Sequence, residues 1–211
     1  MKPASFRGHL IFAPSEGQQV RFTAPERWFE PSAEPEPDIA LAEITRRYLR
    51  AYGPANREEL ARWWGLRSLP QAQRRFDAIG DEVHQVDIDG ERRWALAAAL
   101  EDLLEAKPSR SVRLLPAFDP YVAAAPRGVA AILDATLKSH VYPPQGWLSP
   151  VVLVDGRIVG TWKHEAKTTS LRVEVKPFEL APKWLRRSVE NEARRLGMLF
   201  ELEPVLERKN V

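Results

Sequence analysis

The sequence lacks cysteine entirely, which excludes disulfide scaffolds, cysteine-based zinc sites and thiol nucleophiles. It also lacks an apolar run of the about 18 residues that a membrane-spanning helix requires. The first residues contain no apolar stretch of the kind found in signal peptides. For a chain of 211 residues with 44% apolar side chains, these absences predict a soluble, globular, cytoplasmic protein.

An excess of charge of either sign is also missing. The chain has 31 basic and 29 acidic residues, a net charge of +2, and no long segment is clearly basic. Proteins that depend on phosphate contacts need local positive charge, because counterion release supplies most of their non-specific affinity. Any affinity for nucleic acid must therefore depend on where the arginines point rather than on their number.

The common catalytic motifs do not occur in the chain. There is no P-loop, no Gly-x-Ser-x-Gly and no Gly-x-Gly-x-x-Gly. The four histidines, at positions 9, 84, 140 and 164, are scattered and lack the spacing of a zinc site. We therefore expect no metal and no other cofactor.

Three segments can be distinguished along the chain, and together they predict the α+β class. Residues 1–37 are expected to form a β-hairpin, with strands over 8–13 and 19–23, followed by a proline-rich linker. Residues 38–107 are expected to form a winged helix-turn-helix. Residues 108–211 are expected to form a mixed α+β C-terminal domain.

The middle segment has the clearest pattern. Apolar periodicity predicts helices over about 38–52, 56–64 and 68–79, and Asn56 and Glu59 have the spacing of a capping box at the start of the second. Strands over 83–88 and 92–96 follow, joined by Asp89-Gly90, a strong hairpin signal. Three helices followed by a hairpin indicate a winged helix-turn-helix, whose third helix would enter the major groove of DNA.

Candidate DNA contacts follow from this interpretation. The third helix carries Gln71, Arg74 and Arg75 on one polar face, and such side chains can pair with adenine and guanine. Arg92 and Arg93 lie in the predicted wing, where a cation could reach a phosphate. We expect the four arginines to share one open surface. The competing interpretation is that the polar face serves solubility alone or contacts another protein.

The last segment is predicted to contain a strand over 111–118, a helix over 129–139 and a hairpin of residues 151–154 and 157–162 around Asp155-Gly156. A strand over 171–175 and a helix over 182–200 complete it. Arg157 directly follows the hairpin turn, so this hairpin could probe a DNA groove. The alternative is a pair of core strands with Trp162 as a packing residue.

Asp119 is the one carboxylate in a setting suited to catalysis, at the end of an apolar strand and before Pro120. It could act as a general base or orient a water molecule. The structural alternative is an Asx turn, in which the carboxylate accepts a hydrogen bond from the following backbone.

Three stretches resemble one protein family. They are the helical segment RYLRAYGP at 47–54 with LARWWGL at 60–66, then LLPAFDPY at 114–121, and GWLSPVVLVDGRIVGTW at 146–162. Together they look like the winged-helix DNA-binding proteins related to the bacterial AlkZ-type DNA glycosylases. The resemblance covers the C-terminal half of that family's usual length. It implies tandem winged helices, a β-rich C-terminal region and DNA repair by base excision.

The resemblance also implies a catalytic Gln-x-Gln or Gln-x-Asp motif in the N-terminal half of the family. In this chain Gln71-x-Gln73 matches the letters but lies on the predicted third helix, outside that context. Residues two apart on a helix point about 200° apart, so these amides cannot converge on one substrate. Carried over residue by residue, the resemblance supports a DNA-binding scaffold without a complete base-excision site.

Three functional hypotheses follow. The first is a double-stranded-DNA-binding protein of modest affinity, with Arg74, Arg75, Arg92, Arg93 and Arg157 as its contacts. The second is an active glycosylase for alkylated or crosslinked DNA, in which Asp119 activates water. The third is a protein-interaction module, either a homodimer or half of a split enzyme that pairs with a separately encoded N-terminal half.

Overall fold

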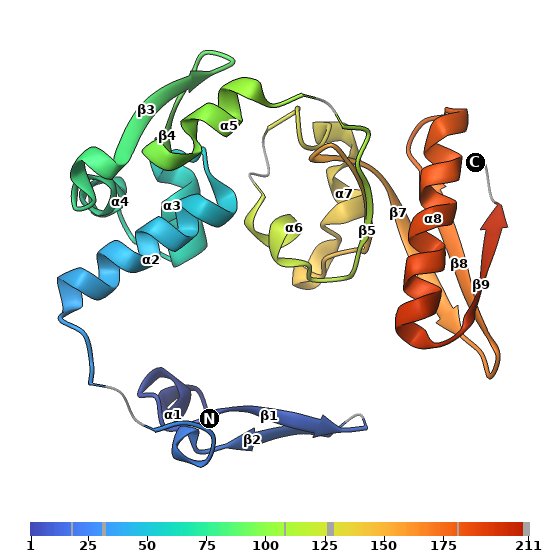
Figure 1. The fold of residues 1–211 in the computed structure, drawn as a ribbon, viewed down its shortest axis with the longest axis horizontal. Helices are drawn as coiled ribbons and strands as arrows, with labels where there is room; N and C mark the ends of the chain where they lie inside the picture. The colour runs from blue at the N-terminus through green and yellow to red at the C-terminus, as the bar shows by residue number, and fades with distance from the viewer. Residues whose placement is uncertain (18, 31–32, 108, 126–128, 181, 209–211) are drawn as a thin grey trace. The chain divides into compact units, whose positions relative to one another are not determined.

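The computed structural model describes residues 1–17, 19–30, 33–107, 109–125, 129–180 and 182–208 (Figure 1). The chain divides into two compact units, residues 1–43 and residues 44–211, and the boundary falls inside one helix. No helix in the described part of the chain is long and apolar enough to cross a bilayer.

The first unit contains the predicted N-terminal hairpin. Its elements are α1 (Lys2–Phe6), β1 (Ile11–Glu16), β2 (Gln19–Thr23) and the 3-10 turn η1 (Pro25–Arg27). The strands pair antiparallel, and the rings of Phe12 and Phe22, which face each other across the pair, lie 5.1 Å apart. Strand β1 continues through Pro14, which we expected in the turn, and the register shifts there between Ala13 and Glu16.

The second unit begins inside the first of three helices that are followed by a hairpin. The helices are α2 (Pro37–Tyr52), α3 (Arg57–Trp64) and α4 (Leu69–Asp77), and the strands are β3 (Val83–Ile88) and β4 (Glu91–Leu96). The capping box is confirmed, because Asn56 Oδ1 accepts from the Glu59 N–H and Glu59 Oε2 accepts from the Asn56 N–H, both at 2.9 Å. The turn between the strands has φ of 54° at Asp89 and 81° at Gly90, a left-handed pair that asparagine, aspartate and glycine tolerate best.

Beyond α5 (Leu100–Glu105), the chain forms a five-stranded sheet in the order β5-β6-β7-β8-β9. Its strands are β5 (Val112–Leu115), β6 (Val151–Val154), β7 (Arg157–Ala166), β8 (Ser170–Pro177) and β9 (Glu203–Arg208). All neighbours pair antiparallel except β8 and β9, which are parallel and are connected through α8 (Lys183–Phe200). Strand β9 was not predicted from the sequence.

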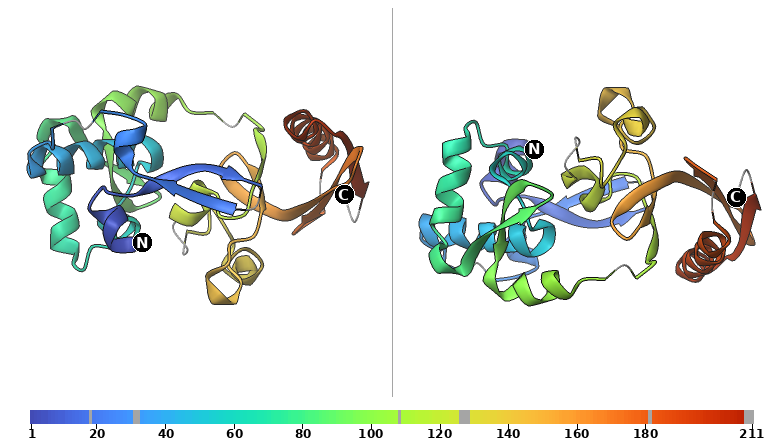
Figure 2. Two further views of the ribbon diagram at one scale, coloured as in Figure 1. Left: turned by 90° about the horizontal axis from the view of Figure 1, so that it is seen from below. Right: turned by 90° about the horizontal axis from the view of Figure 1, so that it is seen from above.

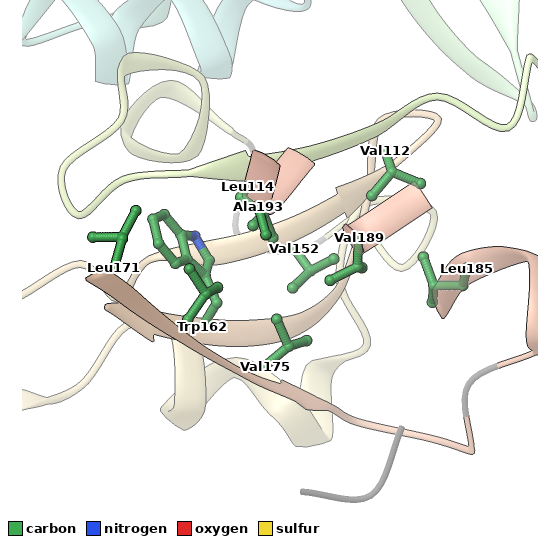
Figure 3. Packing of buried hydrophobic residues seen from close by; sticks show 10 residues of the cluster. Val112, Leu114, Val152, Trp162, Leu171, Val175, Leu185, Val189 and Ala193 are labelled. Atoms are coloured by element: carbon green, nitrogen blue, oxygen red, sulfur yellow. The ribbon is translucent and has the colours of Figure 1, made fainter. Parts of the chain in front are cut away.

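Helix α8 covers one face of this sheet, as Figures 1 and 2 show for β8 and β9. Its apolar side chains Leu185, Val189 and Ala193 pack on residues of β5, β6, β7 and β8, and Trp162 is part of the same cluster (Figure 3). The indole N–H of Trp162 donates to the carbonyl of Leu115 at 2.7 Å. Trp162 is therefore a core residue, as the packing interpretation of this hairpin predicted.

A second, smaller core lies on Val151 and Ile158, beneath α6 (Pro120–Ala124) and α7 (Lys138–Val141). The predicted helix over 129–139 is wrong. Asp134 has non-helical backbone angles, with φ of −58° and ψ of 136°. Its carboxylate accepts from both the N–H and the hydroxyl of Thr136, so a 3-10 turn, η4 (Ala135–Leu137), begins there and leads into α7. Local capping by an aspartate here overrides the helical periodicity.

The described residues form helices packed beside and against β-sheets, so the chain has the α+β class that was predicted.

Candidate nucleic-acid interface

Helix α4 has a buried face and a polar face. Ala72 and Phe76 are buried, and the ring of Phe76 stacks on Trp94 of β4 with 5.1 Å between centroids and 14° between planes. This contact holds α4 against the hairpin. Arg74 is consequently exposed, while Gln71 and Arg75 are half-buried at the border of the polar face.

Arg75 is held by an aromatic ring of the preceding helix. Its guanidinium carbon lies 5.7 Å from the centroid of the Trp64 ring, within cation–π range. The Nε of Arg75 is buried and finds no hydrogen-bond partner among the residues that the structure describes. A planar guanidinium fixed on a ring in this way is oriented before any ligand arrives, which favours bidentate recognition of a base or a phosphate.

The structure separates Arg92 from Arg93. Neighbouring residues of a strand point to opposite faces. Arg92 is exposed, and it pairs across the hairpin with Asp87. Arg93 is only 8% exposed, so the expectation that all four arginines share one open surface is wrong for this residue.

Arg93 has a complete set of partners inside the unit. One nitrogen, Nη1, donates to both oxygens of Glu59, at 2.9 and 2.8 Å, and to the carbonyl of Pro54 at 3.2 Å, while Nη2 donates to Glu91 at 2.7 Å. Burial alone would lower the pKa of Arg93, but the two carboxylates raise it, so the guanidinium stays charged. Burial also raises the pKa of the nearby Tyr48 hydroxyl, and the charge of Glu59 adds to that shift.

Arg157 is the first residue of β7, in the five-stranded sheet. It is exposed, directly after the Asp155-Gly156 turn, and lines a pocket of about 290 Å³ together with Asp134 and Trp184. Hydrogen bonds from Thr136 and the charge of Arg157 hold the pKa of Asp134 below its usual value. Arg157 is therefore available to an anionic ligand, but it lies beside a carboxylate that reduces the local positive field.

Asp119 is the N-cap of α6. Its Oδ1 accepts the N–H of Tyr121 at 2.8 Å, which is the Asx-type arrangement, and the side chain is half-buried. The hydroxyl of Tyr121 in turn donates to the carbonyl of Gly156 at 2.9 Å. Asp119 thus caps α6 through Oδ1. Its other oxygen, Oδ2, is the one that could take part in catalysis.

One feature beside Asp119 was missed in the sequence. The ring of Phe118 meets that of Trp147 edge to face, with 4.9 Å between centroids and 78° between planes, and both rings are exposed. The two residues are 29 positions apart, so no local pattern connects them. The only sequence signal is that each lies a few residues from a strand and close to a proline.

Within the described ranges, no three histidine, aspartate or glutamate side chains gather in the way that a metal ion would require.

Comparison with known proteins gives consistent results. Residues 1–199 match the family model described as DNA glycosylase AlkZ-like. The chain is 34% identical over 197 residues to the interstrand DNA cross-link repair glycosylase of Streptomyces sahachiroi, an alignment that covers 92% of this chain and 52% of that protein. It is also similar to the solved structure of Streptomyces sahachiroi DNA glycosylase AlkZ, with a TM-score of 0.82 and 33% identity over 98% of this chain and 56% of the other. The chain thus spans about half the length of the relatives it matches.

Proposed function

Because the chain belongs to the AlkZ-like DNA glycosylase family, we propose that it binds double-stranded DNA through a winged helix-turn-helix of residues 38–107, with α4 in the major groove. In this proposal β3 and β4 form the wing, residues 1–37 form an N-terminal hairpin with its linker, and residues 108–211 form a separate C-terminal domain. The chain acts as a DNA-binding scaffold without a complete base-excision site of its own.

The observation that carries the proposal is the polar face of α4. Arg74 is exposed at its centre, and Arg75 is oriented by the Trp64 ring. Gln71, one turn earlier, completes a set of side chains suited to reading base edges. Arg92 on β4 supplies a phosphate contact from the wing, and Arg157 supplies one from the second hairpin. Arg93 has a supporting role, because its partners hold the wing and α3 together.

The two glutamines of α4 support the proposal that the chain lacks a complete base-excision site. Gln73, the residue that would complete a Gln-x-Gln pair, donates its amide to Asp77 at 2.8 Å within the same helix. It is thereby directed along the helix surface, away from a shared target with Gln71. The relative from Streptomyces sahachiroi is an interstrand DNA cross-link repair glycosylase, and this chain matches about half of its length.

Equilibrium binding at several salt concentrations tests the proposal. A fluorescein-labelled duplex of about 20 base pairs is titrated with the protein, and anisotropy gives the affinity between 50 and 200 mM salt. The two phosphate contacts, from Arg92 and Arg157, predict a slope of log K against log salt of about −1.8, since each contact contributes about −0.9. Absence of binding at the lowest salt concentration would overturn the proposal.

A second candidate function is base excision that uses Asp119. It is favoured by the half-buried position of this carboxylate beside two exposed aromatic rings. The capping hydrogen bond to Tyr121 favours the structural role instead. Release of free base from a duplex that carries alkylated bases or an interstrand crosslink would support the catalytic role of Asp119. Absence of release would leave only its structural role.

A protein partner, either a second copy or a separately encoded N-terminal half, also stays a prediction. The first unit exposes several large apolar side chains on which such a partner could pack. They are Phe6, Phe12, Val20, Trp28 and Phe29. Light scattering after size-exclusion chromatography measures whether the purified chain is a dimer.

A further inference from the structure

Phe118 and Trp147 form an aromatic pair at the surface. Their rings are in an edge-to-face contact, which is a favourable geometry for two aromatic side chains. Yet Phe118 is 50% exposed and Trp147 is 57% exposed, so about half of each residue remains in contact with water. Two large aromatic side chains that stay exposed side by side form an apolar patch, and such patches often mark a binding site.

The pairing of β5 with β6 explains why these distant residues meet. Leu115, the last residue of β5, is opposite Val151, the first residue of β6. The turn that follows β5 and the loop that precedes β6 therefore leave the sheet at the same end. Phe118 lies in that turn and Trp147 lies in that loop.

The turn that carries Phe118 is held rigidly. Phe118 has φ of 59°, which is rare for a bulky residue and costs conformational energy. The flanking residues maintain it, since the Asp119 N–H donates to the Pro116 carbonyl at 3.3 Å and the Asp119 carboxylate caps α6. On the strand side, the carbonyl of Leu115 accepts from the buried Trp162 indole at 2.7 Å.

The loop that carries Trp147 is anchored as well. Ser149 donates its N–H to Val141 at 3.0 Å and its hydroxyl to His140 at 2.8 Å, which fastens the loop to α7. Gly146, with φ of 77°, provides the left-handed turn immediately before Trp147. Two exposed rings are thus presented by two fixed backbones, and little conformational entropy remains to be lost when a ligand binds.

We propose that Phe118 and Trp147 form a stacking site for an unpaired nucleobase of DNA. This inference rests on the proposed DNA-binding function and adds a substrate feature to it. A base presents a flat π-face that stacks on an aromatic side chain whatever its identity, and two rings set at 78° form a corner that can contact both the face and the edge of a base. A base inside an intact duplex cannot reach such a corner, so the site selects DNA that contains an extrahelical or unstacked nucleotide.

The test compares two labelled duplexes that differ only by one bulged adenine. The wild-type chain is expected to bind the bulged duplex about tenfold more tightly than the fully paired one, as the loss of one stacked base by alanine substitution suggests. Both Phe118→Ala and Trp147→Ala should bring this ratio close to one while the affinity for the paired duplex stays unchanged. Trp147→Phe keeps a ring at this position and should retain most of the preference.

Phe200→Ala is the matched control. Phe200 is 42% exposed, so it too is a partly exposed aromatic residue, but it is the last residue of α8 and belongs to no proposed site. It should leave both affinities unchanged. Because Trp147 has no strained backbone, Trp147→Ala remains informative even where Phe118→Ala unfolds, and circular dichroism verifies the fold of each variant.

The outcomes separate this inference from the proposed function. No binding to either duplex overturns both. Equal binding of the wild-type chain to both duplexes overturns the stacking site and leaves the DNA-binding function in place. A bulge preference that survives Trp147→Ala also overturns the stacking site.

Discussion

Both carboxylate oxygens of Glu59 lie within 2.9 Å of a single nitrogen of Arg93, and both side chains are almost fully buried. Glu59 also accepts the N–H of Asn56, so one carboxylate completes the capping box of α3 and neutralises a buried arginine of β4. Glu59, in the first turn of α3, therefore binds Arg93 of the β3–β4 hairpin, 34 residues later. This connection makes Arg93 part of the scaffold.

Arg93→Ala should therefore reduce stability strongly. Removing one partner leaves the Glu59 charge buried without compensation, and breaking a buried ion pair costs about 3–5 kcal/mol. Urea denaturation followed by tryptophan fluorescence measures the free energy of unfolding. An unchanged midpoint would show that the pair contributes nothing to the fold.

The neighbouring residue gives the matched control with the opposite result. Arg92 is exposed, so Arg92→Ala should change the free energy of unfolding by no more than about 0.5 kcal/mol. If Arg92 contacts a phosphate, the same variant weakens duplex binding and makes the salt slope shallower by about 0.9. Anisotropy titrations at several salt concentrations measure both effects.

Two substitutions at Asp119 separate capping from catalysis. Asparagine is as good an N-cap as aspartate, so Asp119→Asn should preserve stability, whereas Asp119→Ala removes the acceptor for Tyr121 and should cost about 1 kcal/mol. Thermal denaturation of the three proteins measures this difference.

The same pair of variants is then assayed for release of free base from alkylated or crosslinked duplex. If Asp119 activates water, Asp119→Asn abolishes release although it unfolds like the wild-type chain. Release that is equal in Asp119→Asn and the wild-type chain would restrict this residue to its capping role.

Much of the fold follows from local sequence signals. The capping box at Asn56 and Glu59 and the Asp89-Gly90 and Asp155-Gly156 turns were predicted from residues a few positions apart, and the structure contains all three. Each depends on hydrogen bonds or backbone angles within one turn, which the residue type largely determines.

One error is local, since the helix predicted over 129–139 is interrupted by the Asp134 cap. The other errors concern contacts between distant segments. The burial of Arg93 depends on Glu59, the position of β9 depends on its parallel pairing with β8, and the aromatic pair depends on the register of β5 and β6. Alternation along β4 places Arg92 and Arg93 on opposite faces, which the expectation of one shared surface overlooked. It did not indicate which face is buried, because that depends on the helix packed against it.

Asp155 should make stability depend on pH. Slight burial tends to raise the pKa of this carboxyl, but hydrogen bonds from the Ser111 N–H, the Ser109 hydroxyl and the Arg110 N–H outweigh it and lower the pKa. A carboxyl whose pKa is lower in the folded state stabilises the fold at pH values above its unfolded pKa. This contribution is fully present above roughly pH 5 and is lost as the pH falls through the folded pKa.

Asp155→Asn keeps the left-handed turn but loses the charge and one acceptor oxygen. The melting temperature of the variant should therefore lie below that of the wild-type chain at pH 7, and the gap should narrow as the pH falls below about 4. Thermal scans between pH 7 and pH 3 measure the gap. A gap of constant size across this range would contradict a charged role for Asp155.

Gly160 is required because its backbone lies close to that of Lys176 and Pro177 in β8. A Cβ at this position would lie 2.7 Å from the carbonyl oxygen of Lys176 and 2.8 Å from the Cα of Pro177, and both are backbone atoms that cannot rotate away. Gly160→Ala must therefore push the two strands apart beside the register shift at Val152, with an expected loss of about 1–3 kcal/mol in urea denaturation. Ala166→Val, which adds bulk at the exposed end of the same strand, should change stability by no more than about 0.5 kcal/mol. If the two variants have equal free energies of unfolding, the sheet accommodates a Cβ at Gly160. The close approach of β7 and β8 at this position would then not contribute to stability.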